Sequence, residues 1–123
     1  MKLHLANPRN GYTLTGYGKG FLAVNGTRYE HALIVTPDAE PGRWPVESID
    51  ALTAESAALL LVQAPEIIII GTGPTQVFPS PAHLRPLLEA RIGVEIMSTS
   101  AACRTYNVLM GEGRRVLAAI CLP

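Results

Sequence analysis

Four consecutive isoleucines, Ile67 to Ile70, lead directly into the glycine-rich segment Gly71-Thr72-Gly73-Pro74. An apolar run of β-branched residues with no polar alternation is typical of a strand that is buried on both faces. Such a strand needs cover on each side from helices or from a second sheet. The run therefore predicts a core built around a central strand at Glu66 to Ile70.

Helix and strand signals alternate through the rest of this half of the chain. Thr53 and Ser80 are N-cap residues for two predicted helices, and Pro81 suits the first helical position of the second. Consecutive strands joined by helices run parallel through right-handed crossovers. The expected order is a helix from Ala54 to about Gln63, the central strand, a helix from Pro81 to about Arg91 closed by Gly93, a strand from Val94 to Met97, a helix from Ser98 or Thr99 to about Gly111, and a strand from Arg114 to Leu122.

The first half of the chain carries antiparallel signals instead. Asn25-Gly26 lies between Phe21–Val24 and Arg28–Val35, and Asn-Gly between apolar runs strongly indicates a type I′ hairpin. Residues 36–45 form a turn-rich connector, and we expect Trp44, Val46 and Ile49 to return to the core. We therefore expect a mixed α/β (or α+β) fold, in which an antiparallel N-terminal half packs against a small parallel β-α-β-α-β unit, in a single domain over residues 1–123.

Charge and composition exclude several classes of partner. Ten basic and ten acidic residues cancel, so the chain has no electrostatic signature of nucleic-acid binding. Only 16% of the residues are charged and 48% are apolar, a balance that favours a protein partner or self-association. No apolar run approaches the roughly 20 residues that a membrane span needs, and residues 1–11 lack the apolar core of a signal peptide. With only two cysteines, we expect a cytoplasmic protein.

Catalytic and metal-binding patterns are missing from the sequence. Cys103 and Cys121 form no CxxC pair, and the three histidines are far apart, so we expect no metal site. No serine lies in a GxSxG motif, the glutamates show no acid–base pairing, and Asp38 and Asp50 are the only aspartates. The sequence therefore leans away from an enzyme.

Two strand-to-helix corners are the candidate ligand site. Gly71, Thr72 and Gly73 end the central strand, while Ser98 and Thr99 follow the next one, and neighbouring parallel strands would bring both corners to one edge. Their hydroxyls and backbone N–H groups would suit a small anion. The alternative is that the glycines permit a tight turn and the hydroxyls only cap a helix, and Pro74 removes one donor.

The last predicted helix contributes further candidate residues. Arg104 could supply positive charge to the corners, and Cys103 is either a reactive thiol near a helix N-terminus or a small packed side chain. Asn107 is a poor helix former, which indicates a specific hydrogen bond. Tyr106 could bond across the core or to a partner.

These segments together resemble a known family. The segments Ile70–Gly73, Met97–Thr99, Thr105–Leu109 and Arg114–Ala119 are similar in order and spacing to the Mth938-like domain family, also called DUF498. That family includes proteins of unknown function and the mitochondrial complex I assembly factor 3. The resemblance covers about Tyr12 to the end, and it implies a mixed β/α fold with no accepted catalytic residues and no cofactor.

Three hypotheses for function remain open. The first is a non-enzymatic binding or assembly-factor-like module, with a protein partner at the edge formed by Gly71–Phe78 and Ser98–Tyr106. The second is a small-molecule or anion-binding protein that uses the same corners. The third is a homo-oligomer with an interface at an exposed strand edge or at Trp44 and Phe78. The sequence does not set the oligomeric state.

Overall fold

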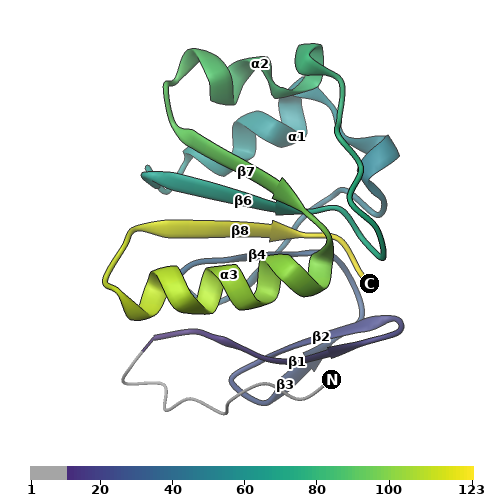
Figure 1. Ribbon diagram of the computed structural model, residues 1–123, viewed down its shortest axis with the longest axis vertical. Helices are drawn as coiled ribbons and strands as arrows, with labels where there is room; N and C mark the ends of the chain where they lie inside the picture. Colours follow the sequence, from purple (N-terminus) through teal and green to yellow (C-terminus); the bar gives the residue numbers. More distant parts are fainter. Residues whose placement is uncertain (1–10) are drawn as a thin grey trace.

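A five-stranded mixed sheet forms the centre of the molecule. The computed structural model describes residues 11–123, so nearly all of the expected lead-in lies outside the described residues. The strand order is β5-β4-β8-β6-β7, and Figure 1 shows the sheet across the middle of the view. The strands are β4 (Leu33–Val35), β5 (Gly42–Arg43), β6 (Ile67–Gly71), β7 (Gly93–Met97) and β8 (Val116–Ile120).

Strand β6 is the central parallel strand that the isoleucine run predicts. It pairs in parallel with both neighbours, so that Ile69 lies opposite Glu95 of β7 and Ala118 of β8. Its side chains alternate between two cores, because Ile68 and Ile70 belong to one hydrophobic cluster and Ile69 to the other. The predicted β-α-β-α-β unit is therefore confirmed.

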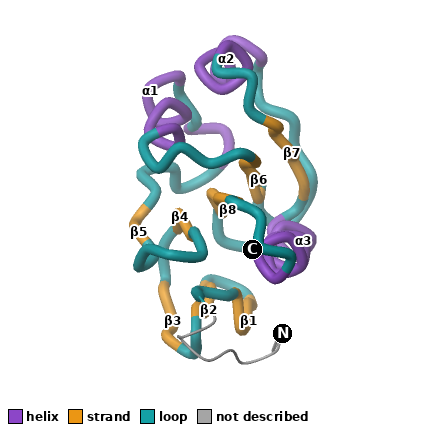
Figure 2. Tube along the Cα trace, turned by 90° about the vertical axis from the view of Figure 1, so that its left-hand side faces the viewer, coloured by secondary structure: helices purple, strands orange, loops and turns teal. Residues whose placement is uncertain are grey.

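The two clusters correspond to two covering layers. Helices α1 (Ala54–Ala58) and α2 (Pro81–Glu89) pack on one face, and α3 (Thr99–Gly111) with a small antiparallel sheet packs on the other. Figures 1 and 2 place α1 and α2 at one end of the molecule and the small sheet at the opposite end. Apolar cover on both faces is what a strand of unbroken isoleucines requires.

The small sheet contains the predicted hairpin. Its strands are β1 (Leu14–Gly18), β2 (Phe21–Val24) and β3 (Thr27–Tyr29), in that spatial order. Asn25 and Gly26 connect β2 to β3 with φ values of 48° and 86°. Both angles lie in the left-handed region that a type I′ turn needs, so this prediction is confirmed.

The continuous strand expected over Arg28–Val35 is wrong. Tyr29 pairs with Leu22 in the small sheet, whereas Leu33 pairs with Ile120 of β8 in the large one. The chain changes sheets between these residues because Leu33 and Val35 become fully buried only beside β8, while Arg28 stays exposed at the edge of the small sheet.

The helix ends differ from the predictions in two places. Thr53 and Ser56 form the capping box of α1, but the helix tightens after Ala58 into the 3-10 helix η3 (Leu59–Leu61), a common ending for an α-helix. Gly93 is not the C-terminal cap of α2, because it is the first residue of β7. The left-handed residue after α2 is Arg91, with φ of 58°, which turns the chain toward β7.

Candidate functional site

The two predicted corners lie side by side. The Thr72 N–H donates to the Met97 carbonyl, and the Thr99 N–H donates to the Gly73 carbonyl, each at 2.9 Å. Neighbouring parallel strands therefore do bring the ends of β6 and β7 to one edge of the sheet. Gly71 leaves little room for a side chain: a Cβ there would lie 3.1 Å from the Ala102 Cβ of α3 and 3.1 Å from the Ile120 Cγ2 of β8, so these neighbours would have to shift.

Two threonine hydroxyls satisfy the polar groups of this edge from within. Thr99 Oγ1 accepts from the Gly73 N–H at 2.9 Å and donates to the Cys121 carbonyl at 2.6 Å. Thr72 Oγ1 donates to the Thr75 carbonyl at 2.6 Å and accepts from the Val77 N–H at 3.1 Å. The Gly73 N–H proposed for an anion is therefore already bonded, and the anion site at these corners stays a prediction.

Ser98 acts as the N-cap of α3. Its hydroxyl accepts from the Ala101 N–H at a long 3.5 Å, so the capping interpretation of this residue is the one with a visible contact. Thr99, by contrast, is 0% exposed. A ligand could reach the Ser98 side of the corner more easily than the Thr99 side.

The other three candidate residues face the small sheet, not the corners. Tyr106 is fully buried and its hydroxyl donates to the Tyr12 carbonyl at 2.7 Å. The Asn107 amide makes two bonds to the backbone of Leu14, accepting from its N–H at 2.9 Å and donating to its carbonyl at 2.8 Å. Arg104 Nη1 donates to the Tyr17 hydroxyl at 2.8 Å. The structure thus divides the candidate residues into a corner group and a group that joins α3 to β1.

Burial controls the ionisation of the groups on α3. It raises the pKa of the Cys103 thiol to about 12, against a smaller opposing effect of Arg104. It also raises the pKa of Tyr106, with a further contribution from the Asp38 charge. Cys103 is therefore a protonated, packed side chain at neutral pH, as the second of the two interpretations predicts.

The loop from Thr72 to Ser80 carries the exposed apolar residues of the corner edge. Phe78 is 72% exposed and Val77 is 38% exposed. The loop is held at its base because Gln76 Nε2 donates to the Ile96 carbonyl at 2.9 Å. Trp44, the other aromatic considered for an interface, is only 1% exposed and donates to the Ser56 carbonyl, so it belongs to the core and that part of the third hypothesis is wrong.

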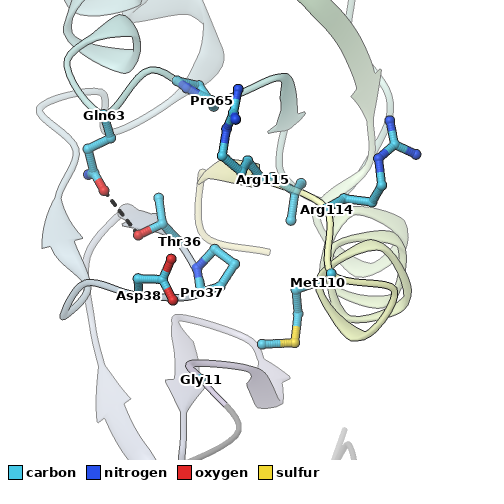
Figure 3. Close-up of a pocket in the computed structure, with 11 residues that line it drawn as sticks. Gly11, Thr36, Pro37, Asp38, Gln63, Pro65, Met110, Arg114 and Arg115 are labelled. Carbon is cyan, nitrogen blue, oxygen red and sulfur yellow. Dashed lines mark hydrogen bonds between the residues drawn. The ribbon is translucent and has the colours of Figure 1, made fainter.

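A cavity of about 480 Å³ lies at the opposite edge of the sheet. Figure 3 shows its walls: Thr36, Pro37 and Asp38 follow β4, while Gln63, Pro65 and Arg115 lie before β6 and β8. The two corners predicted from the sequence both lie at the carboxyl ends of parallel strands. This cavity, which the sequence did not reveal, lies at the other end, because β4 is antiparallel to β8 and the end of β4 lies beside the beginnings of β6 and β8. The turn-rich Thr36-Pro37-Asp38 segment and the pair Arg114-Arg115 were the available signals.

Within residues 11–123, no three His, Cys, Asp or Glu side chains are grouped so as to hold a metal ion. None of the helices in that range combines the length and the apolar character that crossing a bilayer demands.

Solved structures share this fold. A crystal structure of a protein from Bordetella parapertussis is 41% identical, with a TM-score of 0.87 over 92% of this chain and 97% of that one. A solution structure of a Bordetella pertussis protein described as an Mth938-like domain is 37% identical, with a TM-score of 0.80 over 98% of this chain and 92% of that one. The fold is therefore Mth938-like.

Two curated relatives differ in how their names describe them. A "13 kDa major membrane protein" of Francisella tularensis is 33% identical over 101 residues, covering 81% of this chain and 82% of the relative. The NADH dehydrogenase [ubiquinone] 1 alpha subcomplex assembly factor 3 of Bos taurus is 36% identical over 107 residues, covering 85% of this chain. This chain spans only 57% of the length of that assembly factor.

The match to a protein family covers nearly the whole of the described chain. Residues 14–121, from the start of β1 to just past β8, match the family described as "Protein of unknown function (DUF498/DUF598)". The matched segment includes both corners and the residues that join α3 to β1. The resemblance noted in the sequence is thereby confirmed, and the chain belongs to the DUF498/DUF598 family.

Proposed function

We propose that this protein is a non-enzymatic, assembly-factor-like module that binds a protein partner through the loop between β6 and α2. The observation that carries the proposal is its 36% identity to an assembly factor for the NADH dehydrogenase alpha subcomplex. That relative's name makes subunits of a respiratory NADH dehydrogenase the first partners to test. The cytoplasmic setting and the single domain over residues 1–123 remain predictions from the sequence.

The loop has the features of a partner-binding surface. Phe78 exposes 72% of its surface on a loop whose base is fixed by the Thr72 and Gln76 hydrogen bonds. A loop that is fixed before binding loses less conformational entropy when a partner covers it, and large aromatic side chains can contribute strongly to protein–protein affinity. Phe78 is therefore the residue that we expect to anchor the partner.

Affinity recovery of this chain from its own cells at native abundance, followed by mass spectrometry, tests the proposal. Subunits of one complex should be enriched reproducibly and in stoichiometric amounts. We expect Phe78→Ser to reduce this enrichment about tenfold or more, as loss of an interface hot spot does. Val108→Ser is the matched control, because Val108 is also apolar and 60% exposed but lies on α3.

Two results would contradict the proposal. Recovery of the bare chain under conditions that preserve respiratory complexes would remove the assembly role. Recovery of the same subunits with Phe78→Ser but not with Val108→Ser would place the binding surface on α3 instead of the β6–α2 loop.

A further inference from the structure

The cavity at the edge opposite the corners contains two charged side chains of opposite sign that do not pair with each other. Asp38 and Arg115 both line it, and Figure 3 shows Asp38 on one side and the Arg115 side chain extending beside Pro65 on the other. Among residues 11–123, Arg114 forms the ion pair of this region, through a 3.2 Å contact of its Nε with Glu66 Oε1. The Arg115 charge also acts on the Glu66 carboxylate, whereas Asp38 forms no ion pair with a described residue. Both side chains are exposed, so a charge that enters from outside can reach them.

The walls of the cavity are held in position by hydrogen bonds. Thr36 Oγ1 donates to Gln63 Oε1 at 3.0 Å, and the Tyr12 N–H donates to the Pro37 carbonyl at 3.1 Å. On the other side, Glu66 accepts from the Arg115 N–H at 3.0 Å as well as from Arg114. These bonds fix both walls before any ligand arrives, which lowers the entropic cost of binding.

The space between the two charges is partly apolar. Met110, Pro37 and Val116 line it together with the charged residues. Its volume, about 480 Å³, lies within the range of pockets that bind small organic molecules. A ligand that complements these walls has an anionic group for Arg115, a cationic group for Asp38 and an apolar body for Met110.

We propose that this cavity binds a small zwitterion with an apolar body, the chemistry of an apolar amino acid or a short apolar peptide. Arg115 would hold the carboxylate and Asp38 the ammonium group. Both bonds are charge-assisted, which is the stronger class of hydrogen bond. This site is separate from the partner surface around Phe78, so each proposal can fail without the other.

Titration of the full-length ¹⁵N-labelled protein with L-leucine and with L-leucyl-L-leucine, followed by NMR, tests this site. We expect saturable shifts confined to the amides of Thr36, Asp38, Gln63 and Met110–Val116 with at least one of the two probes. N-acetyl-L-leucine and L-leucinamide each lack one charge and should bind about tenfold more weakly or not at all, since each loses a charge-assisted bond.

Single substitutions assign the two charges. Asp38→Asn and Arg115→Gln should each weaken binding about tenfold or more, because each leaves one ligand charge unpaired. Both side chains are exposed, so the fold should survive, and unchanged amide shifts elsewhere would verify this. Arg85→Gln is the matched control, since Arg85 is an exposed arginine on α2.

Three results would overturn the proposal. The first is no saturable shift with either zwitterion. The second is equal binding of the acetylated or amidated derivatives, which would make the cavity a site for a single charge. The third is binding that Asp38→Asn and Arg115→Gln leave unchanged.

Discussion

Thr99 links three segments of the chain through one hydroxyl group. Its Oγ1 accepts from Gly73 after β6 and donates to Cys121 after β8, while its own N–H donates to the Gly73 carbonyl. Threonine suits this place because one side chain supplies both a donor and an acceptor at a position that is 0% exposed. Thr99, which the sequence offered as a ligand contact, thus bonds the ends of β6 and β8 to the start of α3.

Replacing Thr99 with valine tests this role, because valine keeps the shape but removes the hydroxyl. The Gly73 N–H and the Cys121 carbonyl would then be buried without this partner, and we expect the free energy of unfolding to fall by about 2 to 4 kcal/mol. Urea unfolding measures the change. Ser100→Ala is the control and should change stability by less than about 0.5 kcal/mol. Equal stability of Thr99→Val and the control would show that the hydroxyl does not hold the corner.

Helix α3 is joined to strand β1 by side chains on one helical face. Tyr106 and Asn107 both point toward β1, and the Asn107 amide bonds to the Leu14 N–H and carbonyl much as a neighbouring strand would. This explains why a poor helix former lies inside α3. The small sheet has three short strands and depends on this contact, since isolated short hairpins are marginally stable in water.

Asn107→Ala should loosen the small sheet selectively. We expect a loss of about 1 to 3 kcal/mol of unfolding free energy, because both backbone groups of Leu14 lose their partner. Hydrogen exchange should speed up first at Leu14 and along β1 and β2, with β6 and β8 less affected. Val108→Ala, the next residue along but exposed, should leave exchange unchanged. Uniform acceleration over all strands would contradict a local role for Asn107.

At the scale of the molecule, residues 11–123 form two hydrophobic cores, one on each face of the large sheet, with a buried thiol in each. Cys121 belongs to the core under α1 and α2, and Cys103 to the core between α3 and the small sheet. Burial raises the pKa of Cys121 to about 11 and, as the dominant effect, that of Cys103 to about 12, from the ordinary thiol pKa of 9.0. Both thiols are therefore protonated in the folded protein at neutral pH.

These shifts predict the stability of the protein in alkali. A thiol whose pKa is raised by folding contributes stability that is complete below pH 9 and is lost as the pH rises toward 12, because the unfolded chain ionises first. Between those values the free energy of unfolding should fall more steeply for the native protein than for Cys103→Ala, by up to about 1.4 kcal/mol per pH unit. Urea unfolding at a series of pH values measures the difference, and parallel curves would contradict it.

The local signals in the sequence determined the elements of this fold and the nature of its central strand. The isoleucine run, Asn25-Gly26, and the caps at Thr53, Ser80 and Ser98 each depend on the preferences of a few adjacent residues, so they could be identified without the structure. The same locality explains the errors. Residues 28–35 are predicted as one strand but divide between two sheets, because strand pairing depends on partners outside the segment such as Leu22 and Ile120.

Only the tertiary structure decided what the candidate residues contact. The sequence correctly placed the Gly71 and Ser98 corners at one edge, since the order of parallel strands follows from the chain. It did not determine that Thr99 closes the corner, that Tyr106 and Asn107 face β1, or that Asp38 and Arg115 face one cavity from positions 77 residues apart in the chain (115 minus 38). Hydrogen-bond partners and cavity walls come from segments that meet only after folding, and no pattern of neighbouring residues encodes such meetings.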